Sequence, residues 1–151
     1  MSLDAVRNSE LLGQLSDAEL ERLGEASSEE RFAANEVIFE EDGVAETFYM
    51  IVHGKVGLEL TNPGGPPLVI QTLRDGEMVG VSWFFPPYRW EWRARALSET
   101  SVIAFDAEQV RQQCENQCEL ERQLLRGIAK AAATRLHASR TQLLDLYGSS
   151  R

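Results

Sequence analysis

The stretch Phe48-Tyr-Met-Ile-Val-His-Gly-Lys-Val56 is the most informative part of the sequence for the fold. Its first five residues are apolar and rich in aromatic and β-branched types, which is typical of a strand. His53-Gly54 is a turn signal, and the run from Lys55 to Leu60 again has strand character. The stretch therefore predicts two strands joined by a turn.

Runs of the same kind lie on both sides of this stretch. The strand candidates are Glu36–Glu40, Thr47–Val52, Lys55–Leu60, Leu68–Leu73, Trp90–Leu97 and Ser101–Phe105. Turn signals separate them, among them Asp42-Gly43, Asn62-Pro63-Gly64-Gly65 and Asp75-Gly76. An all-β sandwich or barrel typically has about seven strands at this spacing, close to the number of candidates found. Residues 31–106 are therefore predicted to form an antiparallel β-roll or jelly-roll barrel.

Helical patterns flank the predicted β-roll. Leucines from Glu10 to Ala26 recur at helical spacing, and Ser16 followed by Glu19 is a capping-box pattern, so one short helix should end near Leu15 and another should begin there. One helix is predicted near 107–114 and a longer one over about 120–147. At 1.5 Å per residue the longer helix would extend about 40 Å, so we expect part of it to pack on another chain. Residues 1–151 are interpreted as one domain, with helices in 1–30 and 107–148.

The composition limits the function classes. The 15 Lys and Arg against 24 Asp and Glu give a formal charge of −9, which disfavours binding to a nucleic-acid backbone. No signal-peptide pattern or run long enough to span a membrane occurs, so a cytoplasmic protein with no membrane contact is expected. Cys114 and Cys118 are interpreted as reduced thiols. Neither a nucleophile elbow nor a clustered His and carboxylate set appears, so we expect no catalytic residue and no metal.

Aromatic residues and arginines gather in one short segment of this acidic chain. The segment holds Trp83, Trp90 and Trp92, with Arg89, Arg93 and Arg95 among them. Such residues can stack a base and neutralise a phosphate, or they can be core indoles crossed by arginine stems. If 90–97 is a strand, Arg93 and Arg95 face away from the apolar interior, which leaves Arg89 as the better ligand candidate.

The order of these motifs resembles the cyclic-nucleotide-binding fold of the catabolite activator and fumarate-nitrate regulator superfamily. The resemblance rests on Asn35-Glu-Val-Ile-Phe-Glu-Glu-Asp-Gly43, on Phe48 to Val56, on Gly76-Glu-Met-Val-Gly80 and on the long final helix. It implies a β-roll with a short phosphate-binding cassette after Gly80. It also implies a dimer seam along the final helix, which supplies groups that reach the base.

Carried over residue by residue, the resemblance implies an altered cassette. Val81 stands at the position of the usual ribose-binding glutamate, and Trp90 stands at that of the phosphate-binding arginine. Loss of two charge-assisted hydrogen bonds would weaken a cyclic nucleotide by roughly several hundredfold. On the final helix the matching positions are Arg135, Ser139 and Arg140.

Two hypotheses for the function follow. The first is a ligand-sensing regulatory module, homodimeric through the final helix, that binds a nucleotide or another small anionic ligand and signals through an effector protein. Its candidate ligand-binding residues are Gly80, Val81, Ser82, Trp83, Arg89, Trp90, Arg135 and Ser139. The alternative is a protein-interaction module whose pocket is plugged by Trp83 and Trp90. No other cofactor is expected, and direct DNA binding is not, because the sequence ends at Arg151 without the superfamily's winged helix-turn-helix.

Overall fold

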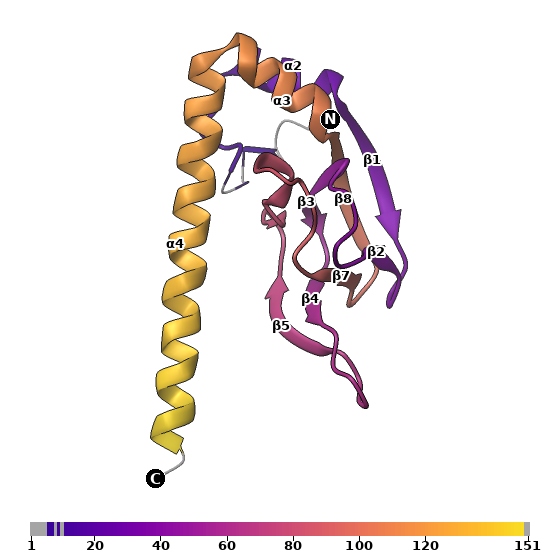
Figure 1. Cartoon of the computed structure of the whole chain (residues 1–151). Coiled ribbons are helices and arrows are strands. Elements are labelled where there is room, and N and C mark those ends of the chain that lie inside the picture. Colours follow the sequence, from indigo (N-terminus) through magenta and orange to yellow (C-terminus); the bar gives the residue numbers. More distant parts are fainter. Residues whose placement is uncertain (1–5, 8, 10, 150–151) are drawn as a thin grey trace.

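The structure is a computed structural model that describes residues 6, 7, 9 and 11–149; for residues 137–143 and 145–149 it describes the backbone alone. A β-sandwich and a group of helices make up the described part of the chain, and the long last helix runs along one side of the sandwich (Figure 1). In chain order the elements are α2 (Asp17–Glu25), β1 (Ser27–Phe32), β2 (Val37–Phe39), β3 (Thr47–His53), β4 (Val56–Leu60), β5 (Leu68–Leu73), β6 (Met78–Val79), the 3-10 helix η1 (Ser82–Phe84), β7 (Arg93–Ala96), β8 (Thr100–Asp106), α3 (Ala107–Asn116) and α4 (Cys118–Ser149).

The described strands form two four-stranded antiparallel sheets. Their orders are β1-β8-β3-β6 and β2-β7-β4-β5. The predicted antiparallel roll is confirmed, as two sheets rather than one closed barrel among the described residues. At the turn between β3 and β4, Gly54 has φ +128°, and a Cβ there would lie 2.5 Å from Thr100 Oγ1. Glycine is the residue that this turn accommodates.

Alternation along β3 explains two apolar clusters. Phe48 and Met50 point out of the sandwich and pack with leucines of the helices. Ile51 points between the sheets, where it meets Val56 of β4 and Ala94 of β7. The first sheet is thus covered by helices on one face and by the second sheet on the other.

The helix predictions are confirmed except for the first. Ser16 caps α2 with the complete capping box: Ser16 Oγ accepts from the Glu19 amide, and Glu19 Oε1 accepts from the Ser16 amide. The helices α3 and α4 match their predicted ranges closely. The short helix predicted to end near Leu15 is wrong, because residues 11–14 form a turn. There Ser9 Oγ accepts from the amides of Leu11 and Leu12, a local bond that competes with helix formation.

Two strands were missed and one was extended too far. The missed strands are β1, whose sequence is largely polar and exposed, and the two-residue β6. The strand predicted from Trp90 begins only at Arg93, because the Trp90 backbone pairs with the loop after β2 instead. Within β7 the predicted alternation is confirmed: Ala94 and Ala96 are buried, and Arg93 and Arg95 face outward.

Candidate functional site

The candidate site is the segment Gly80 to Trp90, hereafter the cassette segment, which follows β6. Gly80 has φ +82°, which glycine adopts readily. Val81 packs on the helical side of the core, and Ser82, half-buried, opens η1. The segment then passes through the cis bond Pro86–Pro87 to Trp90. The sequence-predicted residues from Gly80 to Trp90 therefore lie on one continuous turn between the two sheets.

The indole of Trp90 closes the start of this segment. Its side chain is 4% exposed and stacks on the ring of Phe39, with centroids 3.9 Å apart. A Cβ built on Gly80 would lie 2.7 Å from Trp90 Cζ3. The Trp90 backbone is also fixed, because its N–H donates to Gly43 O at 2.9 Å and its carbonyl accepts from the Asp42 amide at 2.7 Å. The six-membered ring of the indole thus occupies the space against the glycine turn.

Trp83 is a core residue of the helical side. It is fully buried and stacks on Phe48 of β3, with centroids 3.7 Å apart. Phe84 meets it edge to face at 5.1 Å. Its Nε1 has no hydrogen-bond partner among the described residues. Trp83 therefore anchors η1 from the side of the sheet that faces the helices, whereas Trp90 covers Gly80.

Arg89 lies at the surface, in an acidic neighbourhood. Its Nη1 donates to the carbonyl of Asp42 at 2.8 Å. The surrounding surface groove has a volume of about 800 Å³, and it is lined by Arg89 and Arg93 together with four carboxylates, those of Glu40, Glu41, Asp42 and Glu91. Because the negative charges outnumber the positive ones and repel an anion, the position of Arg89 does not favour the phosphate contact suggested by the sequence.

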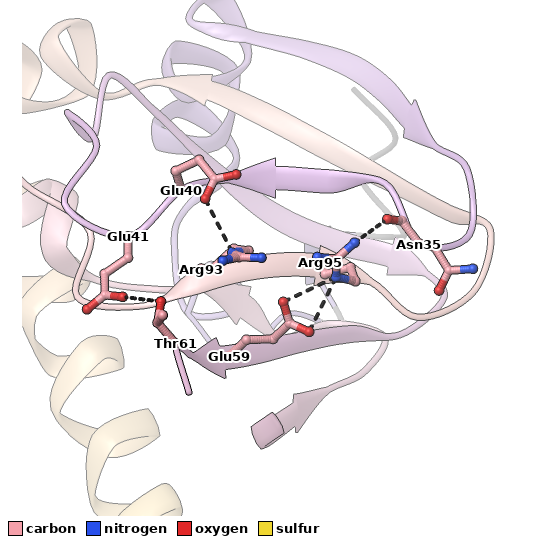
Figure 2. A network of polar contacts seen from close by, with 7 residues as sticks. All are labelled: Asn35, Glu40, Glu41, Glu59, Thr61, Arg93 and Arg95. Carbon is pink, nitrogen blue, oxygen red and sulfur yellow. Dashed lines mark hydrogen bonds and ion pairs between the residues drawn. The ribbon is translucent and has the colours of Figure 1, made fainter. Parts of the chain in front are cut away.

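The two arginines of β7 are paired with glutamates, Glu59 on the neighbouring strand β4 and Glu40 directly after β2 (Figure 2). Arg95 Nε lies 3.2 and 3.3 Å from the two oxygens of Glu59, and its Nη1 donates to Asn35 O at 2.8 Å. Arg93 Nε lies 3.3 Å from a Glu40 oxygen. Glu59 is 5% exposed, so Arg95 neutralises a buried carboxylate on the outer face of the sheet.

The helix α4 reaches the candidate site through Arg135. Its Nη2 donates to the carbonyl of Met78 at 2.9 Å, two residues before Gly80. The same nitrogen lies 4.0 Å from Glu77 Oε2. The predicted approach of the final helix to this site is therefore found for Arg135. The side chain of Ser139, like that of Arg140, lies outside the described residues.

Three residues that pack around the cassette segment were missing from the sequence prediction. Phe39 stacks on Trp90, Phe48 stacks on Trp83, and Arg111 of α3 donates to the Trp83 carbonyl at 2.7 Å. Phe39 and Phe48 lie in predicted strands, so period-two alternation signalled burial but not the partner. Arg111 carried no signal, because a lone arginine on a polar helix is usually solvated.

Tyr49 is an ionisable group between the sheets. Its ring stacks with Phe39 at 6.4 Å and meets Phe32 edge to face at 5.8 Å. Burial raises the pKa of its hydroxyl, and the nearby Glu30 carboxylate raises it further. The phenol is therefore neutral at pH 7 and adds an aromatic wall, not a charge, to the interior.

Comparison with known proteins identifies the family. A family model described as the cyclic nucleotide-binding domain matches residues 29–117, so the chain belongs to the cyclic nucleotide-binding domain family. The fold of this family is that of a ligand-binding regulatory module. The resemblance stated from the sequence is thereby confirmed. No match was found among curated proteins.

Solved structures support the same assignment. A candidate cyclic nucleotide-binding protein from Geobacter metallireducens GS-15 has 26% identity and a TM-score of 0.82, covering 91% of this chain and 99% of its own. The N-terminal domain of a transcriptional regulator from Streptomyces coelicolor A3(2) has 25% identity and a TM-score of 0.71, covering 89% and 94%. The sensor domain of the transcriptional regulator DNR from Pseudomonas aeruginosa, at 17% identity and a TM-score of 0.72, covers 89% and 90% and shares the fold.

Among the helices described, none is both long and apolar enough to cross a membrane. Within the same part of the chain, no group of three or more His, Cys, Asp or Glu side chains is arranged to hold a metal ion.

Proposed function

We propose that this chain is a non-enzymatic regulatory module of the cyclic-nucleotide-binding fold whose cassette is closed by its own indole and which signals through contact with a protein. In this proposal residues 1–151 act as one cytoplasmic unit. The module does not hold cyclic AMP or cyclic GMP by the contacts that the family resemblance implies. Of the two sequence hypotheses, this is the alternative, the plugged module, but with Trp90 alone as the plug, because Trp83 packs on Phe48 on the helical side of the sheet.

The observation that carries the proposal is the place of Trp90. The resemblance puts a phosphate-binding arginine at this position, and the residue present is a buried indole packed between Phe39 and Gly80. A phosphate at the turn would have to displace an aromatic side chain that is 4% exposed. Burial of a tryptophan is worth several kcal/mol, about as much as millimolar ligand binding provides.

The charges around the segment support the same proposal. Val81 offers no carboxylate to a ribose hydroxyl, and it packs into the core instead. Arg93 and Arg95 are paired with Glu40 and Glu59, and Arg89 lies in the acidic groove. None of these three guanidinium groups has a described contact with Gly80, so a phosphate bound at Gly80 would gain little from them.

A sensor of a small anionic ligand is the second candidate, and Arg135 favours it. The guanidinium of Arg135, on α4, donates to the Met78 carbonyl, and the Arg135 side chain is 19% exposed. A ligand that moved Trp90 aside would find one positive charge at the edge of the turn. In this second candidate function the Trp90 indole is a gate that opens when the ligand binds. The contact with the protein partner then follows ligand binding.

Contacts with other chains are proposed on exposed apolar side chains. Leu136 and Leu144 of α4 are exposed, and so are three consecutive residues of β5, Leu68, Val69 and Ile70. Clusters of exposed aliphatic residues mark interaction sites on soluble proteins. We assign the α4 residues to a homodimer seam and the β5 residues to an effector protein.

Calorimetry with the cyclic mononucleotides and cyclic dinucleotides tests the proposal. The wild-type chain should show no binding heat and no thermal shift at about 1 mM nucleotide. The double variant V81E/W90R restores both family groups and should bind cyclic AMP. Its matched control is V81E/W90L, which restores the carboxylate without the guanidinium and should not bind. Melting curves establish that each variant is folded.

The two candidates give different results in this assay. Wild-type binding of any one nucleotide with a micromolar Kd would overturn the closed module and favour the gated sensor. Binding by V81E/W90L as strong as by V81E/W90R would show that the loss of arginine at position 90 is irrelevant, which contradicts the reason given for closure.

A further inference from the structure

Arg111 on α3 contacts the cassette segment at two separated points. Its Nη1 donates to the carbonyl of Trp83 at 2.7 Å, and that hydrogen bond is partly buried. Its guanidinium carbon lies 4.0 Å from the ring centroid of Tyr88, a cation–π contact. The Trp83 carbonyl belongs to η1, near the start of the cassette segment, and Tyr88 lies near its end, two residues before Trp90. A single side chain therefore spans the exposed stretch Phe85–Pro87.

Both contact points are tied to the parts of the segment that hold the indoles. Trp83 is fixed by its stack on Phe48. Tyr88 has φ +56°, and its carbonyl accepts from the Ala45 amide at 2.7 Å, adjacent to the bonds that fix Trp90. A backbone shift that carries the Trp90 ring away from Gly80 also moves Tyr88, because only Arg89 lies between them in the chain.

The other end of Arg111 belongs to a helix that leads directly to α4. Val110 and Cys114 are buried on the inner face of α3, and Gln113 Nε2 donates to Arg22 O at 3.1 Å. The helix ends at Asn116 and α4 begins at Cys118, so one residue, Gln117, separates them. A tilt of α3 is therefore passed to the start of α4.

We infer that Arg111 is the positioning residue that couples the cassette segment to α3 and, through the Gln117 junction, to α4. This inference rests on the proposed function in one respect, that the cassette segment is the part whose state the module reports. The planar guanidinium can donate to a carbonyl and lie over a ring at the same time. A lysine ammonium is a point charge without a planar fork, so R111K should retain only part of the coupling.

Cys114 supplies a built-in reporter for the position of α3. It lies one turn after Arg111 and is 4% exposed. Burial raises the pKa of its thiol to about 11, with a smaller contribution from Glu121, so the docked helix resists thiol reagents. Cys118 is exposed and would mask the signal. Every variant is therefore made in a C118S background, where the labelling rate measures undocking of α3 alone.

A double-mutant cycle between Trp90 and Arg111 is the test. W90L perturbs the cassette segment while keeping an apolar side chain, and W90F replaces it if W90L fails to fold. With Arg111 present, the Trp90 variant should raise Cys114 labelling by roughly fivefold or more, the usual range of coupling between sites. In the R111A background the same change should raise it less than about twofold.

Hydrogen exchange gives the second readout. R111A alone should raise amide exchange in residues 82–90 by about tenfold. R122A is the matched control, since Arg122 makes an exposed ion pair with Glu119 on α4 and should leave both readouts unchanged. Y88F keeps the ring and should behave as wild type, whereas Y88L should reproduce part of the R111A effect.

Equal labelling increases with and without Arg111, including no increase in either, would overturn the inference, as would unchanged exchange in R111A. The cycle contains no nucleotide, so its result is separate from that of the calorimetry. The proposed function can fail by nucleotide binding while Arg111 still couples the two parts. The coupling can equally fail in a module that binds no nucleotide.

Discussion

Glu59 is a buried carboxylate on the outer face of the second sheet, and its partner is Arg95. The side chains of Glu59 and Arg95 are 7% and 25% exposed, and both carboxylate oxygens lie within 3.3 Å of Nε. Arg93 and Glu40 form a similar pair nearby, but the Glu40 side chain is 65% exposed (Figure 2). The two pairs therefore allow one interaction to be compared at two depths.

Replacement of Arg95 should destabilise the fold, because it leaves the Glu59 charge buried and unpaired. We expect R95M to lower the free energy of unfolding by about 2 kcal/mol, less than for a fully buried pair because Arg95 is partly solvated. R93M, the control, should cost less than about 1 kcal/mol. Urea unfolding measures both. The double variant E59L/R95M should recover most of the loss; equal losses in R93M and R95M would contradict the role of burial.

The raised pKa of the Cys114 thiol predicts how the stability of the fold responds to alkaline pH. Its folded-state pKa is raised to about 11 from an ordinary value near 9, chiefly by burial. The unfolded chain therefore releases this proton first, and stability that is complete below pH 9 declines as pH rises toward 11. The loss should approach about 2 kcal/mol at most.

The measurement is urea unfolding of the wild type, C114A and C118A at several pH values from 7 to 11. C114A should show a shallower decline than the wild type. C118A, which removes the exposed cysteine, should keep the wild-type slope. Parallel slopes for all three proteins would show that Cys114 does not contribute.

Six of the strands were predictable from the sequence because their residues alternate or are densely apolar. The missed β1, Ser-Ser-Glu-Glu-Arg-Phe, is an edge strand that pairs with β8, and its polar residues are suited to a solvent-facing edge. Its strand state comes from the backbone partners of β8, which local sequence does not encode. The two-residue β6 likewise exists only because Met78 and Val79 pair with β3.

The capping box of α2 is an element whose sequence signal and structure agree. The Glu19 amide donates to Ser16 Oγ at 3.2 Å. S16A should lower the free energy of unfolding by about 1 kcal/mol, because that amide loses its partner. S28A, which removes an exposed serine hydroxyl from β1, is the control and should change stability little. A thermal-unfolding comparison that gave the two variants equal stability would contradict the cap.

The site was only partly predictable from the sequence. The motif order located the turn at Gly80 and the approach of Arg135, because both follow from the fold. The directions in which the indoles of Trp83 and Trp90 point could not be predicted from the sequence. Trp83 points to the helices and Trp90 to Gly80, and these choices depend on Phe48 and Phe39, which are distant in sequence. Arg89 could not be assigned either, because its acidic surroundings are assembled from several loops and strands.

For the whole molecule, the length of α4 has a consequence for assembly. Its 32 residues extend about 48 Å. The helix begins beside α2 and α3, and its C-terminal end lies far from them (Figure 1). The buried residues Leu120, Leu124, Ile128 and Ala131 face the body of the domain. Leu125 and Leu136 are exposed on another side of the helix, which favours packing against a second copy.

We therefore expect a dimer in solution. L136E should shift the chain toward the monomer, because a charge would enter the apolar seam. T134E adds the same charge at an exposed position two residues earlier, on a different side of the helix, and should remain dimeric. Sedimentation equilibrium distinguishes the cases. A monomeric wild type, or equal dissociation of both variants, would contradict the seam.

Closure of the cassette segment by Trp90 underlies the whole functional account. Nuclear magnetic resonance of the tryptophan indole N–H groups and the Gly80 amide, without and with about 5 mM cyclic AMP, measures it directly at a concentration where even weak binding is visible. We predict that the Trp90 and Gly80 resonances do not move and that the Trp90 backbone amide, which donates to Gly43 O, stays protected from solvent exchange. Saturable shifts of both resonances on addition of the nucleotide would contradict it.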